Sequence, residues 1–397
     1  MSTTDSGSAF QPGPTDVSDQ GKAASTLELF FDLVFVFAFT QVTSFLVDHL
    51  TWVGLARGVA ILAAVWWAWV VYSWLTGAAS AEETISERVI LLAAMTSMVV
   101  VALSIPGAFG ETALVFGVAY FLVRFLHVLL YILTASSETR DAVVRVAPGF
   151  LGGPALILAA SFFADPLASV LWAAALAIDY GIVFVRGVEG FECDVGHFVE
   201  RHQLIMIIAL GESIVAIGIG VGTEGLTSGP VVLLSVLLGF TLIVALWWLY
   251  FDYIILAAGQ KLAETSGYER TRLARDSYSV LHLPIVGSII FIALGIEQTL
   301  AHLTEPLGLI AAVGLCGGSA LYLFGHNAWR YHDHGTVSVA RLIVTVITVG
   351  LLFVAVRVPA FVALTVLTAL FVGLAAYETI FSADRNAIRG RHLSKSD

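Results

Sequence analysis

Long apolar segments recur along almost the whole of this chain, and they constrain its fold more than any other feature. A helix needs about 20 apolar residues to cross a bilayer, and segments of that length follow one another with short polar connections. Of the 397 residues, 58% are hydrophobic and 12% are charged, whereas soluble domains have about 25% charged residues. The sequence therefore predicts an all-α polytopic integral membrane protein, because one water-soluble core could not bury so much apolar surface.

The apolar segments predict about twelve transmembrane helices in the lipid bilayer. The predicted spans are residues 27–47, 52–75, 87–105, 112–134, 147–164, 168–186, 202–221, 231–253, 277–301, 307–326, 341–357 and 360–378. Ser25 and Glu28 form a capping-box pattern, which marks the start of the first helix.

The basic residues predict the orientation of the chain. All of the 19 Lys and Arg residues except Arg57, Arg124 and Arg357 fall in the N-terminal tail, the even-numbered loops or the C-terminal tail. Because cytoplasmic loops carry the excess of Lys and Arg, we expect both termini in the cytoplasm and a multi-pass protein of the plasma membrane. The net charge of −11 argues against nucleic acid as a partner.

The two halves of the chain resemble each other. Residues 64–67 read AVWW and residues 245–248 read ALWW, at corresponding places in the second and eighth spans. We therefore expect a first six-helix repeat at 25–195 and a second at 196–380, which makes a 6+6 parallel internal repeat because six is even. A disordered cytoplasmic tail at 1–24, rich in Ser, Thr, Asp, Gly and Pro, and a basic cytoplasmic tail at 381–397 complete the predicted domains.

Glu212 is the most informative polar residue within a predicted span. It lies about ten residues into span 202–221, which is roughly 15 Å along a helix and near the bilayer midplane. A charged side chain there costs about 2.5–3.5 kcal/mol or more, so it needs a partner or a function. A carboxylate that handles protons or cations is one interpretation, and a buried ion pair or a protonated, hydrogen-bonded acid is the other.

The first span carries a second polar face. Asp32, Val36 and Thr40 recur every four residues, which places them on one side of the helix, and Gln41 adds an amide next to Thr40. This face either lines a cavity or pore, or Asp32 is held by loop backbone or a cytoplasmic arginine.

Arg124 and His127 lie on one face of the fourth span. Arg124 is the basic residue deepest in any span, and Glu212 and Asp179 are its natural partners. We interpret Arg124 as a fixed counter-charge, and His127 either titrates near neutral pH or is a satisfied core histidine.

His326 begins a polar segment at the end of the tenth span, residues 326–334, with three histidines and an aspartate. Their spacing matches no standard zinc pattern, so we expect no metal there and interpret the segment as a polar helix end.

Signatures of soluble enzymes are missing from the sequence. It has no Gly-x-Ser-x-Gly, P-loop, His-Glu-x-x-His or dinucleotide fingerprint, so no catalytic residue and no cofactor is expected. Cys193 and Cys316 do not suggest a disulfide framework.

Two motifs resemble a known family. Residues 28–36 (ELFFDLVFV), together with residues 201–203 (RHQ) and 210–214 (LGESI), are similar to the bacterial low-temperature-requirement A family. The resemblance covers nearly the whole chain after the tail, and it implies an association with growth in the cold.

A more distant resemblance is to the endosomal and lysosomal potassium channel family, which also has six-helix repeats. Residues 30–32 stand where that family has a Phe-Ser-Asp motif, with Phe31 in place of the Ser, and Thr40 follows at the same spacing. The resemblance implies that spans 1 and 7 line a pore and that a homodimer supplies four such helices.

These patterns favour a channel or transporter for a small cation or proton. Glu212, Asp32, Thr40, Ser213 and Gln41 would lie on the transport path. The groups that supply counter-charge or sense pH would be Arg124, His127, Asp179 and His326. Val36 and Ile208 would form a hydrophobic gate. The alternative is a membrane-embedded enzyme or lipid-binding protein with a polar intramembrane cavity, and a third possibility is a membrane protein that aids cold adaptation without transport.

Overall fold

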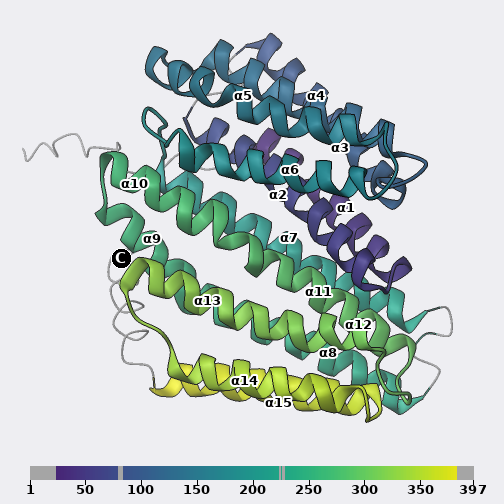
Figure 1. The fold of residues 1–397 in the computed structure, drawn as a ribbon. Coiled ribbons are helices and arrows are strands. Elements are labelled where there is room, and N and C mark those ends of the chain that lie inside the picture. The colour runs from purple at the N-terminus through teal and green to yellow at the C-terminus, as the bar shows by residue number, and fades with distance from the viewer. Residues whose placement is uncertain (1–23, 79–83, 223–224, 226–228, 382–397) are drawn as a thin grey trace, which may run out of the picture.

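The computed structural model describes residues 24–78, 84–222, 225 and 229–381, and this part of the chain is a bundle of helices (Figure 1). The first half contains α1 (Thr26–Asp48), α2 (Trp52–Ala78), α3 (Ile85–Ser104), the 3-10 helix η1 (Ile105–Gly107), α4 (Ala113–Thr134), α5 (Ser137–Ala160) and α6 (Leu167–Val185). The second half contains α7 (Val195–Val221), α8 (Pro230–Leu249), η3 (Tyr250–Ile254), α9 (Ile255–Glu264), α10 (Gly267–Leu273), η4 (Ala274–Val280), α11 (His282–Ala301), α12 (Leu309–Ala312), η5 (Val313–Gly317), α13 (Gly318–His334), α14 (Val339–Ala355) and α15 (Ala360–Phe381).

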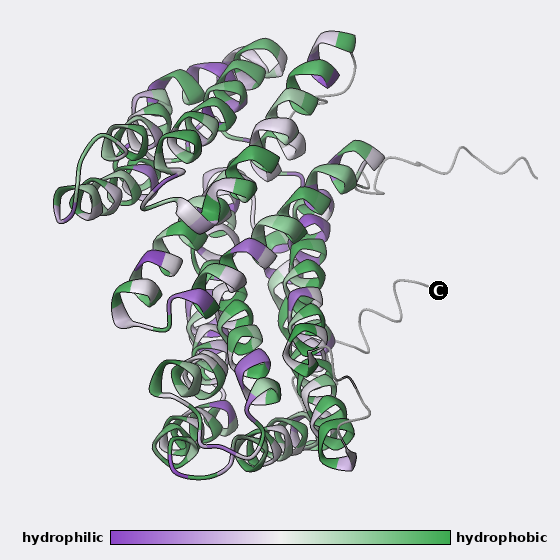
Figure 2. Cartoon of the chain, turned by 90° about the vertical axis from the view of Figure 1, so that its right-hand side faces the viewer, coloured by the Kyte–Doolittle hydropathy of each residue, from purple (hydrophilic) through white to green (hydrophobic). Residues whose placement is uncertain are grey.

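The helices have the length and composition that a bilayer requires. Among the described residues, 11 helices are long and apolar enough to cross a membrane, and α14 is a shorter apolar helix of 17 residues. Hydrophobic residues cover most of the long helices (Figure 2), and outward-facing side chains such as Val346 and Val185 are 72% and 79% exposed. Such exposure suits lipid and not water, which confirms the predicted polytopic membrane protein.

Several helices begin or end farther out than their apolar segments indicated. The helix α5 begins at Ser137 and not at 147, and α7 begins at Val195 and not at 202. Both are capped by a polar side chain, since Ser136 accepts the amide of Thr139 and Asp194 accepts the amide of His197. Polar turns therefore extend these helices beyond the span that hydropathy detects.

Three spans of the second half contain π-helical segments, namely η3, η4 and η5. Each continues directly into the following α-helix, so α8–α9, α10–α11 and α12–α13 are three continuous passes. A π segment inserts an extra residue into the helical turn and often marks a functional site. Two of these segments contribute to the buried polar groups described below.

The helices α7, α11 and α13 form the packed centre of the second half. The Cβ of an alanine at Gly220 would lie 2.7 Å from the carbonyl oxygen of Glu297, so α7 and α11 touch backbone to backbone there. Gly295 brings α11 equally close to η5, where an added Cβ would lie 2.4 Å from the Leu315 nitrogen. Helices α3–α5 lie at one end of the molecule and α14 and α15 at the other (Figure 1).

The first and second halves meet where α1 packs against α7. Residues of α1 and α7 contact one another in the same order along both helices, as the contacts of Glu28 with His197 and of Thr40 with Glu212 show. The two helices therefore run parallel, as a parallel repeat requires. The 6+6 repeat and its domain boundaries remain predictions, and the predicted tails lie almost entirely outside the described residues.

Candidate functional site

The interface between α1 and α7 contains two acidic centres, and the first is at the beginning of both helices. Glu28, which also completes the capping box with Ser25, lies 2.9 Å from Nε2 of His197. Arg201 reaches Asp32 at 2.7 Å and Glu28 at 3.5 Å. All four of these charged or titratable side chains are at most 3% exposed. We call Glu28, Asp32, His197 and Arg201 the charge cluster.

Asp32 is held firmly within the charge cluster. Its Oδ1 accepts hydrogen bonds from Arg201 and from the indole of Trp69, at 2.7 and 2.8 Å. Of the two interpretations from the sequence, the structure therefore places Asp32 against an arginine and not in a described cavity. The partner comes from α7 and not from a loop.

Glu212 forms the second centre, farther along the same interface. Its Oε2 lies 2.6 Å from the hydroxyl of Thr40, and its Oε1 has no hydrogen-bond partner in the described residues. The side chain is 1% exposed. Since α7 begins earlier than predicted, Glu212 lies roughly 25 Å from the start of this helix, well beyond its midpoint.

The surroundings of Glu212 are polar on one side only. Thr43 and Glu297 are close enough to interact electrostatically with Glu212, and Glu297 interacts in turn with Asp48, which is exposed near the end of α1. No basic side chain contributes to these interactions in the described part of the chain. Glu212 is therefore a buried acid whose charged neighbours are also acids.

The other predicted path and gate residues lie around this contact. Ser213 is fully buried and its hydroxyl has no partner among the described residues, whereas Gln41 is partly exposed. Val36 and Ile208 are partly exposed, and both precede the Thr40–Glu212 contact by one helical turn.

Arg124 pairs with Asp179 and not with Glu212. Its two terminal nitrogens each lie 2.8 Å from an oxygen of Asp179, a bidentate pair, and the hydroxyl of Tyr120 is 3.4 Å away. Arg124 and Asp179 are 0% and 2% exposed. The pair thus joins α4 to α6 as a closed structural unit.

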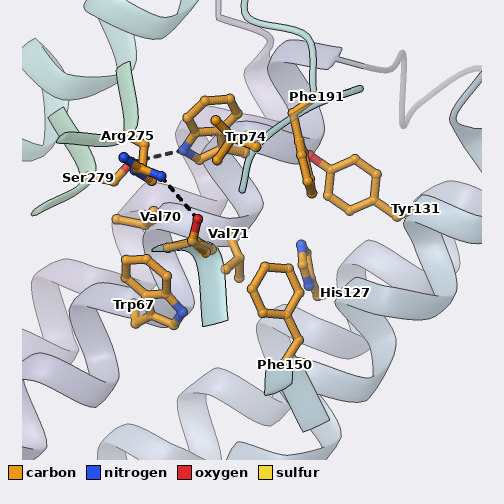
Figure 3. A pocket seen from close by; sticks show the side chains of 12 residues that line it. Trp67, Val70, Val71, Trp74, His127, Tyr131, Phe150, Phe191, Arg275 and Ser279 are labelled. Atoms are coloured by element: carbon orange, nitrogen blue, oxygen red, sulfur yellow. Dashed lines mark hydrogen bonds between the residues drawn. The ribbon is translucent and has the colours of Figure 1, made fainter. Parts of the chain in front are cut away.

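His127 lies among aromatic rings in the first half. Both ring nitrogens lack a hydrogen-bond partner in the described residues, and the ring packs against Tyr72, Tyr131 and Phe150. His127, Tyr131 and Phe150 border a cavity of about 30 Å³ (Figure 3), which has room for water. Arg275 and Ser279 of η4 close this cavity from the second half.

His326 belongs to a further buried polar group that the sequence did not reveal. Its Nδ1 lies 2.7 Å from Arg341, and Arg341 forms a bidentate pair with Glu378 at 2.8 and 2.7 Å. His332 and Asp333 of the same segment face elsewhere, since both contact Ser277.

No group of three or more His, Cys, Asp or Glu side chains in the described residues could hold a metal ion. The two cysteines are unpaired. Burial raises the pKa of the Cys193 thiol in its loop to about 12, which removes the thiolate that a nucleophilic cysteine needs.

The fold and the buried polar interface define a polytopic α-helical membrane protein. The chain belongs to the bacterial low temperature requirement A protein family, whose model matches residues 23–376. An uncharacterized protein of Rhizobium meliloti (strain 1021) is 33% identical over 321 residues, which cover 78% of this chain and 77% of that protein. No solved structure matches the chain.

Proposed function

We propose that this protein transports protons or small cations across the membrane and that Glu212 is the group that binds them. One observation carries the proposal: Glu212 is buried, it has no basic partner in the described residues, and one of its oxygens has no hydrogen bond. The other described acids that are at most 3% exposed, Glu28, Asp32 and Asp179, each contact an arginine. Keeping an acid without such a partner within a membrane is costly, so it needs a function.

The contact with Thr40 suits a carboxyl group that gains and loses a proton. The Thr40 hydroxyl lies 2.6 Å from Glu212 and 3.2 Å from the carbonyl oxygen of Val36. A hydroxyl donates one hydrogen bond and accepts others. Thr40 therefore donates to Glu212 when the carboxylate is ionised. When Glu212 is protonated, it donates to Thr40, which then donates to Val36. The hydrogen bond persists in both states.

The two directions away from Glu212 differ in chemistry. Toward the charge cluster, the partly exposed Val36 and Ile208 come next, and hydrophobic constrictions of this kind act as gates by excluding water. In the other direction lie Thr43, Glu297 and Asp48. We propose that the acidic side admits the cation and that the apolar side closes the path.

The remaining parts of the proposal concern the cellular setting. The distribution of Lys and Arg supports a plasma-membrane protein with cytoplasmic termini. Family membership supports a role linked to growth at low temperature. We further propose a homodimer, in which the outward faces of α1 and α7 from two copies meet.

Flux measurements with purified protein in liposomes test the proposal. Gradients of protons, K⁺ and Na⁺ would be imposed in turn, and Glu212→Gln would be compared with the wild type. Gln keeps the size and polarity of the side chain but cannot release a proton. The matched control is Glu305→Gln, which removes an exposed acid.

We expect flux in the wild type and in Glu305→Gln, and flux at the level of protein-free liposomes in Glu212→Gln. Unchanged flux in a folded Glu212→Gln protein would remove Glu212 from the path. Absence of flux in the wild type under every gradient would contradict transport of these ions.

A further inference from the structure

A polar cavity of about 230 Å³ lies between η3, the end of α13, the start of α14 and the end of α15. It is separate from the α1–α7 interface and from Glu212, and its lining includes His326, which the sequence suggested as a counter-charge or pH sensor. Its polar walls come from His326, Asn327, Arg330, Arg341 and Glu378. A cavity with this lining has room for the charged part of a ligand.

The position of Arg341 in the wall is fixed by three different partners. Besides its pair with Glu378 and its contact with His326, it donates to the carbonyl oxygen of Leu249 at 3.0 Å. Arg341 is 2% exposed, whereas the side chain of Glu378 is 14% exposed. By comparison, the bidentate pair of the first half, Arg124 and Asp179, is enclosed completely. The second-half pair thus forms part of an accessible surface.

Positive charge predominates in the lining. Arg330 adds a second guanidinium, which lies over the ring of Tyr253 and donates to Thr336, while Glu378 is the one acid among the described lining residues. The helix α14 also begins at the cavity, where Ser338 is its N-cap and Val339 and Ala340 form its first turn. A helix N-terminus carries partial positive charge and favours anions.

The rim of the cavity is apolar and faces outward. Val339, Tyr377 and Phe381 line it and are 65%, 52% and 68% exposed. In a membrane-spanning bundle, such side chains lie against lipid, and aromatic residues are enriched at the level of the headgroups. An occupant with an anionic head and an apolar tail therefore fits both the walls and the rim.

We propose that this cavity binds a phosphate group, and specifically the headgroup of an anionic phospholipid. Guanidinium groups recognise phosphate through paired hydrogen bonds, and basic pockets between transmembrane helices bind anionic headgroups in the same way. The site does not include Glu212. A result that contradicts the lipid site would therefore leave the proposed transport function untouched, and the reverse also holds.

Native mass spectrometry of the full-length protein in detergent tests the site. The probes are dioleoylphosphatidylglycerol, dioleoylphosphatidylcholine and inorganic phosphate. Two variants address the cavity: Arg330→Gln removes one guanidinium, and Ala340→Phe fills the space while every charge remains. Arg341 is left unchanged because its loss would strand Glu378. Arg140→Gln, an exposed arginine of α5, is the matched control.

We expect phosphatidylglycerol to bind about tenfold more tightly than phosphatidylcholine, because both lipids offer a phosphate but the positive choline of phosphatidylcholine is repelled by the guanidinium groups. Both cavity variants should lose this preference, and Arg140→Gln should keep it. Binding of inorganic phosphate that the cavity variants abolish, without a preference for phosphatidylglycerol, would retain the phosphate site and identify a soluble ligand. Equal binding of both lipids with no phosphate binding, or an equal loss in Arg140→Gln, would overturn the proposal.

Discussion

The two acidic centres of the α1–α7 interface are built from the same helices but are compensated very differently. In the charge cluster, Glu28 and Asp32 share the guanidinium of Arg201, and His197 adds a further contact to Glu28. Farther along the interface, Glu212 contacts the hydroxyls of Thr40 and Thr43 and has no basic partner in the described residues. Burial is nearly the same in both centres, so the difference lies in the partners alone.

This difference indicates a structural role for the charge cluster and agrees with the transport role proposed for Glu212. An intact buried ion pair adds little net stability, because desolvation of both charges offsets their attraction. Removal of one partner is nevertheless strongly destabilising, because the other charge is then buried alone. The charge cluster therefore fixes how α1 and α7 align. Glu212 contributes no such attraction, and its removal should cost the fold little. Substitutions in the charge cluster should consequently lower stability, whereas substitutions at Glu212 should lower transport.

The largest effect on stability is expected from Arg201→Gln. This change leaves two buried carboxylates without their guanidinium, and the loss of one partner from a buried pair costs about 3–5 kcal/mol. Unfolding of the purified protein in mixed micelles, followed by circular dichroism, measures the loss. Glu212→Gln should shift the same transition by less than about 1 kcal/mol. A similar loss in both variants would erase the distinction between the two centres.

The pair of Arg124 with Asp179 provides a test of compensation in the first half. Arg124→Gln alone should destabilise by about 3–5 kcal/mol, whereas the double variant Arg124→Leu with Asp179→Leu should recover most of that loss, because no buried charge remains unpaired. The same unfolding assay compares the two. If the double variant also retains ion flux in liposomes, the pair has no part in transport; flux lost while stability recovers would give Arg124 a role beyond counter-charge.

The smallest effect is expected from Thr40→Val, which removes the hydroxyl that contacts Glu212 but keeps the shape of the side chain. Loss of one hydrogen bond should cost about 0.5–1.5 kcal/mol, while flux should fall because Glu212 loses the donor that lies 2.6 Å from its Oε2. Thr40→Ser keeps a hydroxyl at the same place and serves as the control. Equal flux in the Val and Ser variants would show that the hydroxyl is not used.

The sequence was sufficient to predict a polytopic helical membrane protein, because every helix that crosses a bilayer needs about 20 mostly apolar residues. It could not predict where α5 and α7 begin, since their first turns are polar and are held by Ser136 and Asp194. The π segments also escaped prediction, because an extra residue in one turn leaves the hydropathy of a span unchanged.

For the site, the sequence indicated which residues are unusual but not how they pair. Arg124 had two plausible partners, and the choice of Asp179 depends on how the fold brings α4 and α6 within reach of each other. Arg201 and Arg341 were counted as loop charges near span ends, yet the structure buries both. The signal that could have found them is that each lies directly at the start of a predicted span, residues 202–221 for Arg201 and 341–357 for Arg341.

The glycine contacts of α7 and α11 have a mechanical consequence. Where two backbones touch, as at Gly220 and Glu297 and again at Gly295 and Leu315, sliding or tilting would drive main-chain atoms into each other. Helices α7, α11 and the α12–α13 pass should therefore move as one rigid body. Glu212 belongs to that body and Thr40 does not. A movement that exposes Glu212 should then be a rotation of α1 away from the rigid body of α7, α11 and the α12–α13 pass. The axis of that rotation would lie at the charge cluster, where the N-terminal ends of α1 and α7 are held together.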